Sequence, residues 1–160
     1  MKTPFIYGTQ LLTADDKKRI TIGADFRRLI DPEMAGGAFV ITLFNGIPCL
    51  YPERYYEELM NAQLPPQIAP DRDLVEYTQL KFALAVTAKL DAQWRITLPD
   101  SVIKDANLGT DLALVGNRDH LQLHDRKSWE ILRAKLIKES GAIEARATAA
   151  LKSKKDETHP

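Results

Sequence analysis

Two short stretches, one in each half of the chain, decide the fold. Residues 14–23 read ADDKKRITIG, and residues 90–99 read LDAQWRITLP. An aspartate, an arginine, an isoleucine and a threonine occupy the same places in both, and the next position is aliphatic in both. Because internal repeats define an architecture before any single element does, this match predicts two copies of one supersecondary unit.

The likeness continues beyond these stretches in the same order. Residues 37–42 (GAFVIT) parallel residues 109–114 (GTDLAL), and residues 50–52 (LYP) precede a helical pattern as residues 123–125 (LHD) do. Each unit therefore reads as strand, short helix, strand, strand and helix. Short strands cannot bury their faces alone, so we expect the copies to pair about a pseudo-twofold axis and share a small β-barrel flanked by helices, an α+β fold.

Local signals set the expected elements. Residues 19–22 and 95–98 alternate polar and apolar side chains, which is typical of half-buried strands. Residues 39–44 form an apolar, β-branched run, and Asn45-Gly46 after it is the strongest hairpin signal in the chain. Helices are expected over residues 52–60, over residues 71–84 and after Asp125, the last with a core stripe of Trp129, Leu132 and Leu136.

These elements divide the chain into four parts. Residues 1–64 are the first unit, 65–84 a proline-rich linker with a connecting helix, and 85–140 the second unit. Residues 141–160 are basic and alanine-rich, and we expect a flexible tail there, frayed from residue 152 onward.

Composition excludes several classes of protein. The chain has 160 residues and a formal charge of zero, so any attraction to nucleic acid must come from a local patch. Cys49 is the only cysteine, which leaves no disulfide framework and favours a reducing cytoplasm. No stretch approaches the roughly 18 apolar residues of a membrane span.

The sequence indicates no catalytic, metal or cofactor site and no small-molecule substrate. Phosphate-cradling loops and nucleophile elbows are missing. His120 and His124 would share one face of a strand about 13 Å apart, too far for one metal ion, and we interpret them as solvated or pairing side chains. Cys49 is expected to be a small buried residue at a strand end.

The two Asp-x-x-x-Arg segments, Asp15 to Arg19 and Asp91 to Arg95, allow two interpretations. In the structural one, each aspartate ends a loop and pairs with its arginine, contributing about 0–1 kcal/mol as an exposed pair. In the functional one, the bases around the first copy contact DNA phosphates: Lys17, Lys18, Arg19, Arg27 and Arg28. Local charge favours the first copy as the DNA surface and leaves a mainly structural role for the second.

The segments resemble the MraZ family, bacterial transcriptional regulators made of two tandem AbrB-like units in a swapped-hairpin fold. The family pattern is Asp-x-x-Gly-Arg, an aliphatic-polar-aliphatic-Pro strand and then Phe-Arg. Here residues 15–19 with Phe26-Arg27, and residues 91–99, carry it. The entry to a helix at residues 50–52, and Leu108-Gly109, are also similar, and the likeness covers roughly residues 5 to 138.

The resemblance implies a ring-shaped homo-oligomer in the cytoplasm, associated with the nucleoid. It would bind repeated promoter sites in double-stranded DNA and repress the division and cell-wall gene cluster. By position, the DNA-facing residues would be Lys17, Lys18, Arg19, Arg27 and Arg28, with Arg95 as the second-copy counterpart. Asp15 and Asp91 would be motif residues.

Two departures from the family pattern concern the turn before each arginine. Lys18 and Trp94 stand where the family has glycine, and Gly23 ends the first strand where proline is usual. If the glycine serves a turn with positive φ, both loops must be reshaped. Trp94 then suggests that the second copy packs against a neighbour or has another partner.

Two other hypotheses remain. The chain could be an oligomeric scaffold that recognises protein through Trp94 and the acidic middle, or an antitoxin-like AbrB relative whose tail folds on a toxin.

Overall fold

The computed structural model describes residues 2–64, 66 and 71–158, and these form a mixed α+β fold. The chain divides into two compact units, residues 1–126 and 127–160. The first unit holds the strands β1 (Thr9–Thr13), β2 (Arg19–Thr21), β3 (Ala38–Phe44), β4 (Ile47–Pro52), β5 (Val86–Lys89), β6 (Arg95–Thr97), β7 (Asp111–Gly116) and β8 (Leu121–Asp125). Its helices are α1 (Ala24–Leu29), α2 (Pro32–Ala35), α3 (Glu53–Gln63), α4 (Arg72–Thr78), the π-helix η1 (Gln79–Ala83) and α5 (Asp100–Asp105).

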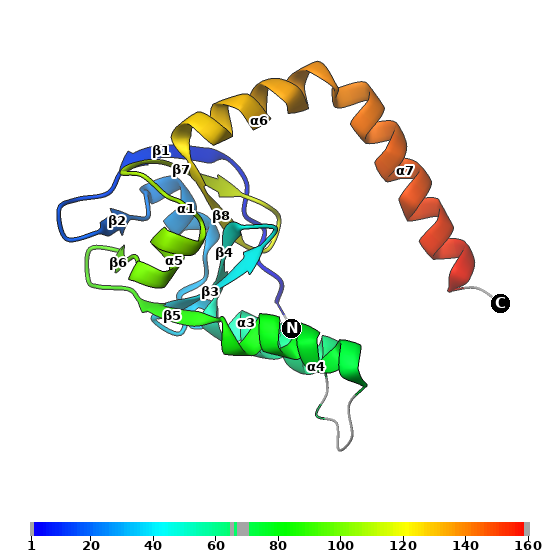
Figure 1. Ribbon diagram of the computed structural model, residues 1–160, viewed down its shortest axis with the longest axis horizontal. Coiled ribbons are helices and arrows are strands. Elements are labelled where there is room, and N and C mark those ends of the chain that lie inside the picture. Colours follow the sequence, from blue (N-terminus) through cyan, green and yellow to red (C-terminus); the bar gives the residue numbers. More distant parts are fainter. Residues whose placement is uncertain (1, 65, 67–70, 159–160) are drawn as a thin grey trace. The chain divides into compact units, whose positions relative to one another are not determined.

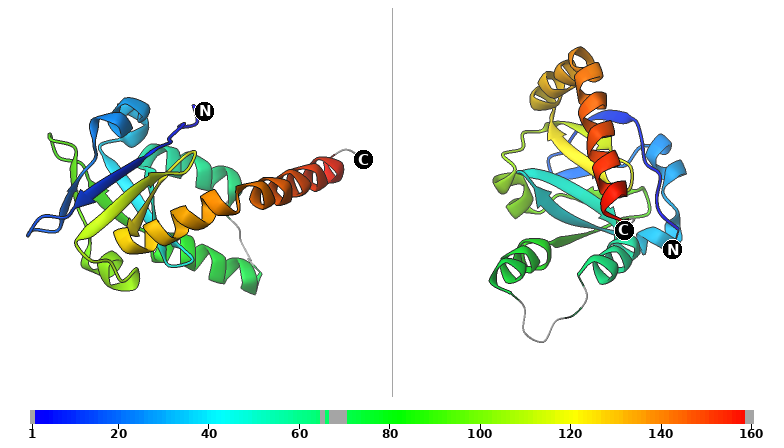
Figure 2. Two further views of the ribbon diagram at one scale, coloured as in Figure 1. Left: turned by 90° about the horizontal axis from the view of Figure 1, so that it is seen from above. Right: turned by 90° about the vertical axis from the view of Figure 1, so that its right-hand side faces the viewer.

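Six strands form one antiparallel sheet in the order β1-β7-β8-β4-β3-β5, and β2 pairs with β6 in a separate two-stranded ribbon (Figure 1). The counterparts in the two copies are β1 and β5, β3 and β7, and β4 and β8. Exchanging every strand for its counterpart gives the same order read from the opposite edge of the sheet. β1 pairs with β7 and β5 with β3, so each copy lends an edge strand to the other. Figure 2 shows β1 alongside β7 at one edge. The sheet is open at β1 and β5, so the closed barrel expected from the sequence is not formed by the described residues.

The expected inner strands and turns are confirmed. β2 and β6 lie within the predicted ranges, and β3 with β4 forms the predicted hairpin. At its tip Asn45 and Gly46 have φ of 50° and 77°, the left-handed pair that a tight hairpin turn needs. The edge strands β1 and β5 were not predicted. β1 reads TQLLT and is only partly buried, so it lacks an apolar face that marks it as a strand.

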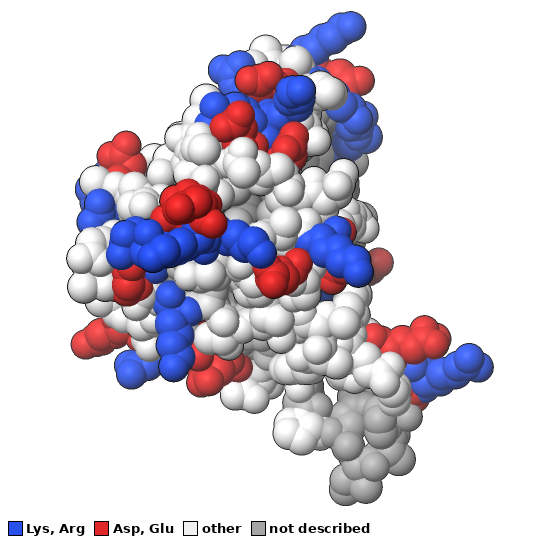
Figure 3. Space-filling view, turned by 60° about the vertical axis from the view of Figure 1, so that its left-hand side comes forward, with Lys and Arg blue, Asp and Glu red and all other residues white. Residues whose placement is uncertain are grey.

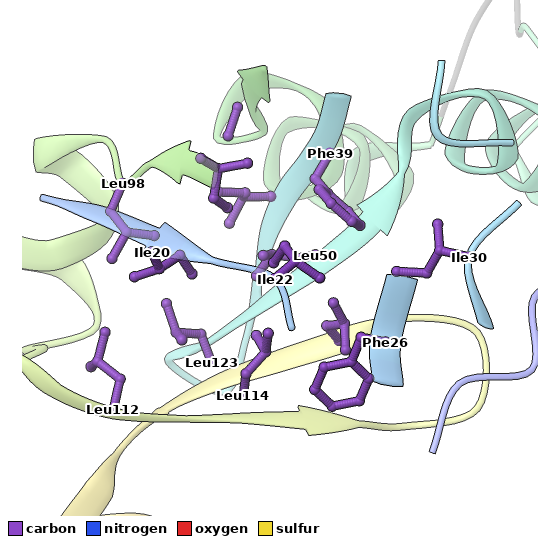
Figure 4. Packing of buried hydrophobic residues seen from close by; sticks show 14 of the residues in the cluster. Ile20, Ile22, Phe26, Ile30, Phe39, Leu50, Leu98, Leu112, Leu114 and Leu123 are labelled. Carbon is purple, nitrogen blue, oxygen red and sulfur yellow. The ribbon is translucent and has the colours of Figure 1, made fainter. Parts of the chain in front are cut away.

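The main core lies between the inner face of the ribbon and one face of the sheet. Figure 4 shows side chains of both copies pointing toward one another there. The fully buried members include Ile20, Ile96, Leu112 and Leu123. On β3, Phe39 belongs to this core while its neighbour Val40 packs with Tyr56 and Met60 of α3 on the other face. Both faces of β3 are therefore covered, which explains its continuous apolar run.

The helices depart from expectation at three places. The helix predicted over residues 71–84 is present as α4, but its last turn is the π-helix η1. In the second unit, α6 (Arg126–Lys138) buries Trp129, whereas Leu136 is 41% exposed and is not a core residue. Residues 152–157, which were expected to be frayed, belong to α7 (Ser140–Glu157), whose sequence is rich in alanine and other good helix formers. Residues 65 and 67–70 of the proline-rich linker lie outside the described residues.

Candidate nucleic-acid interface

The first Asp-x-x-x-Arg segment forms a closed loop around the carboxylate of Asp15. Oδ1 accepts hydrogen bonds from the backbone N–H groups of Lys17 (2.9 Å) and Arg19 (2.8 Å), and Oδ2 accepts one from Nε of Arg19 (2.7 Å). The backbone N–H of Asp15 donates to the carbonyl of Arg19 (3.0 Å), and that of Lys18 donates to the carbonyl of Asp15 (3.0 Å). One carboxylate thus fixes both the turn and the guanidinium that follows it.

The second segment repeats this loop bond for bond. Asp91 accepts from the backbone N–H groups of Gln93 and Arg95, both at 2.9 Å, and from Nε of Arg95 at 2.7 Å. In addition, Nη2 of Arg95 donates to Oε1 of Gln93 (3.3 Å). The repeat seen in the sequence is therefore a repeat of hydrogen bonds.

These hydrogen bonds lower the pKa of both carboxyl groups. The hydrogen bond from the backbone N–H of Arg19 is the largest contribution that lowers the pKa of Asp15, and the equivalent bond from Arg95 lowers the pKa of Asp91. The ion pairs themselves are partly exposed, so they contribute little to folding. Their main effect is to orient the arginines.

The residues that stand where the family pattern has glycine adopt a positive φ. Lys18 has φ of 61° and Trp94 has φ of 58°, in the left-handed region. The two loops share the same bonds, and their reshaping relative to a loop with glycine stays a prediction. Trp94 is half-buried and packs against the main core. A tryptophan held this way presents little surface to another partner.

Pairing of β2 with β6 brings the two segments together. Thr97 lies opposite Arg19, and Arg95 lies opposite Thr21. Since alternate residues of a strand share a face, both arginines and both threonines lie on the outer side of the ribbon, while the isoleucines between them are buried. Diagonal neighbours on such a face are about 7–8 Å apart. Arg19 and Arg95 therefore belong to one surface, which was not predicted from the sequence.

The bases around the ribbon are closely balanced by acids. Besides the two aspartate–arginine pairs, Nζ of Lys18 pairs with Asp100, while Lys17 is exposed beside the acidic Asp16. Figure 3 shows basic and acidic side chains interspersed on this side of the first unit, not one continuous basic patch. Any DNA contact here depends on the placement of individual side chains more than on bulk charge.

Arg27 and Arg28 are positioned differently from the other candidates. Both are exposed on α1, and they line a groove of ≈ 610 Å³ together with Phe5 and Tyr7 from the N-terminal segment. The structure thus places four of the six predicted DNA-facing residues on the ribbon and its loops, and the other two beside this groove. The four are Lys17, Lys18, Arg19 and Arg95.

The outer face of the ribbon also holds two residues that were not predicted from the sequence. Thr21 and Thr97 lie between and beside the motif arginines on this face. The period-2 pattern of the two strands contained the signal for them, because it puts residues 19 and 21, and residues 95 and 97, on the same side.

The residues considered for metal or nucleophilic chemistry are in structural positions. Cys49 is buried in β4, and burial raises the pKa of its thiol to about 11. Both histidines are pairing side chains, one of the two expected alternatives: His124 is buried against Oε1 of Gln122 (3.1 Å), and His120 pairs with Asp119 (2.8 Å). Burial lowers the pKa of His124. Within the described residues, no group of three His, Cys, Asp or Glu side chains is arranged to hold a metal ion.

Comparison with known proteins gives the family. The protein named transcriptional regulator MraZ of Salinispora tropica is 31% identical over 139 residues, covering 86% of this chain and 93% of its own. The chain belongs to the MraZ family. The MraZ proteins of Desulfosudis oleivorans (28% identical; 77% of this chain, 82% of its own) and Nocardia farcinica (31%; 77% and 82%) are also similar. The family model described as "MraZ protein, putative antitoxin-like" matches residues 82–152, which include the MraZ segment around Arg95.

None of the described helices of this MraZ-family chain is both long and apolar enough to cross a membrane.

Proposed function

We propose that the protein is a DNA-binding transcriptional regulator that inserts the β2–β6 ribbon into the major groove. The observation that carries this proposal is the pairing that puts Arg19 and Arg95 on one outer face. A major groove about 12 Å wide admits a two-stranded ribbon, whose strands lie about 4.8 Å apart. The relatives named above are transcriptional regulators by name, which supports the same function.

Each aspartate orients the arginine that follows it. Within the Arg19 side chain, Asp15 binds only Nε, and among the described residues neither terminal nitrogen of that side chain makes a hydrogen bond. Those nitrogens can donate to guanine O6 and N7 or to a phosphate, and a guanidinium already held in place loses less entropy on binding. Lys17 and Lys18 supply phosphate contacts at the end of the ribbon, and the exposed Arg27 and Arg28 are further candidates.

A homo-oligomeric ring would compensate for the weakness of one such contact. A few phosphate contacts bind weakly and are sensitive to salt, but several copies on repeated promoter sites gain by effective concentration. By resemblance to its family, the protein would repress the division and cell-wall gene cluster and act in the cytoplasm at the nucleoid.

For the architecture, we propose two tandem AbrB-like units, residues 1–64 and 85–140, related by a pseudo-twofold axis with swapped hairpins. The symmetric strand order and the exchange of edge strands support this arrangement.

Glutamine at Arg19 and Arg95 tests the DNA contact. The double variant Arg19→Gln/Arg95→Gln should bind DNA from upstream of its own gene at least about tenfold more weakly at 50 mM salt. The slope of log K against log salt should fall by about 0.9 for each phosphate that the variant no longer neutralises. The control Arg54→Gln/Arg133→Gln removes two exposed arginines elsewhere and should leave both quantities unchanged. Equal binding by the two double variants would show that the ribbon is not the DNA surface.

A further inference from the structure

The α4–η1 helix has an outer face that no other described element of the first unit covers. Its side-chain contacts lie within the helix, where Glu76 pairs with Arg72 (3.9 Å) and Nζ of Lys81 lies over the ring of Tyr77. Tyr77, Leu80 and Leu84 recur at helical spacing and are 39%, 41% and 55% exposed. Two acidic residues lie on the same side of the helix. Asp73 is one turn before Tyr77, and Glu76 is one turn before Leu80. We call these five residues the acceptor face. It is acidic at the start of α4 and apolar at the end of η1.

The inner side of this helix is firmly held, so the exposure is not a sign of a loose segment. The hydroxyl of Tyr56 donates to the carbonyl of Lys81 (2.7 Å), and Ala85 packs with the Val40 cluster beneath it. The last turn is a π-turn, with the N–H of Leu84 donating to the carbonyl of Gln79 (3.3 Å). Such turns occur often at functional positions, since a regular helix does not form them at random.

Helix α7 carries a complementary face. Ile143, Ala147, Leu151 and Lys154 recur at i, i+4, i+8 and i+11 and therefore lie on one side; Leu151 is 63% exposed. We call these four residues the tail face. An 18-residue helix with no buried residue is marginal in water, so a surface that covers it would stabilise it.

The two faces match in length and in order. Residues 73 to 84 and residues 143 to 154 each span eleven steps, about 16 Å of helix. Laid antiparallel, Leu80 falls opposite Ala147, Leu84 opposite Ile143, and Asp73 opposite Lys154, while Leu151 falls opposite Glu76, one residue from Tyr77. Apolar positions then meet at the η1 end, Leu151 lies beside both Glu76 and Tyr77, and the acidic end meets the basic Lys154.

The two units have opposite net charges, which agrees with this match between the faces. Residues 1–126 contain 14 Lys and Arg against 17 Asp and Glu, and residues 127–160 contain 8 against 5, which together give the 22 of each sign in the chain. A negative first unit and a positive second unit attract one another between copies at moderate salt.

We propose that α7 of one copy docks antiparallel on the α4–η1 acceptor face of a second copy of this chain. The proposal builds on the self-association in the proposed function and names its contact. The two faces differ, so the contact is head-to-tail, and repetition of it closes a ring if the rotation allows. A closed ring leaves no free tail or acceptor face and presents several ribbons at once.

Disulfide cross-linking between two single variants tests the contact without DNA. Leu80→Cys and Ala147→Cys are purified separately and mixed under mild oxidation. Cys49 is buried and its thiol pKa is about 11, so it does not compete. A covalent dimer containing one chain of each variant is the expected product. The control mixture, Leu80→Cys with Lys152→Cys, places the second thiol on the opposite side of α7 and should give none. If the first mixture gives no more dimer than the control, the proposal is wrong.

Charge reversal provides a second check that does not depend on oxidation. Lys154→Glu should weaken association about tenfold at 50 mM salt, measured as solution mass against concentration, while Lys152→Glu should not. Adding Asp73→Lys to Lys154→Glu should restore association, and equal masses for Lys154→Glu and Lys152→Glu would overturn the contact. The Arg19→Gln/Arg95→Gln variant should keep its mass, so loss of DNA binding and loss of assembly are separate results.

Discussion

At the scale of single residues, the turn before each motif arginine is the most informative position. Lys18 and Trp94 both adopt a left-handed backbone that favours glycine, at a cost of roughly 1–2 kcal/mol for a residue with a Cβ. From the sequence, a positive φ at this turn could be predicted, but the hydrogen bonds that hold the turn could not. In each copy the aspartate carboxylate accepts three of them.

Glycine at the two positions should have opposite effects on stability. Lys18→Gly relieves the strained φ and removes only an exposed pair with Asp100, so it should stabilise the fold by about 0.5–1 kcal/mol. Trp94→Gly relieves the same strain but removes a ring packed on the main core, and it should destabilise the fold by about 2 kcal/mol or more. Urea denaturation measures both. Destabilisation by Lys18→Gly would show that the side chain, not the backbone, dominates at this turn.

The buried His124 should make stability depend on pH. Burial lowers its pKa below the usual 6.5, so above pH 6.5 it is neutral in both the folded and the unfolded chain and has no effect. Below pH 6.5 the unfolded chain binds the proton first, and the free energy of unfolding falls as the pH falls. His124→Gln should flatten the change in this free energy between pH 7.5 and 5. An unaltered pH profile in the variant would assign the dependence to other groups.

At the scale of elements, the sequence indicated the inner strands and not their partners. The alternation in residues 19–22 and 95–98 predicted β2 and β6, but nothing local predicted that they pair with each other. β1 and β5 were missed because each is a short edge strand that is stabilised by a strand of the other copy. The π-turn in η1 was also missed, because no residue pattern marks it; within this turn the carbonyl of Lys81 accepts a hydrogen bond from Tyr56 of α3.

Two glycines test how the edge strand and the tail helix are held. A Cβ at Gly116 would lie 2.7 Å from the backbone of Tyr7, so Gly116→Ala should push the N-terminal segment away from β7 and cost about 1–3 kcal/mol. Gly141 in α7 has open space around it, and Gly141→Ala should raise helix stability by up to about 1 kcal/mol. Thermal unfolding followed by circular dichroism checks both. A neutral Gly116→Ala would mean that the N-terminal segment is not closely packed in solution.

At the scale of the whole molecule, the duplication explains how two motif arginines come to lie on one face. Both copies contribute to one core and one sheet, and the ribbon places one motif arginine from each copy on the same outer face. Local charge alone favoured the first copy for DNA contact, because nothing in the sequence indicated the pairing of β2 with β6. In the proposed function, the nearly balanced charge around the ribbon makes a single contact weak, and several copies on repeated sites would bind more firmly.

Photo-cross-linking from the ribbon tests this arrangement most directly. A photoactivatable group attached to Thr21→Cys lies between the two arginines, and the buried Cys49 stays unlabelled. With DNA from upstream of the gene, it should cross-link strongly at low salt, whereas the same group on the exposed Thr87→Cys of β5 should not. Cross-linking from Thr87 and none from Thr21 would contradict DNA binding by the ribbon.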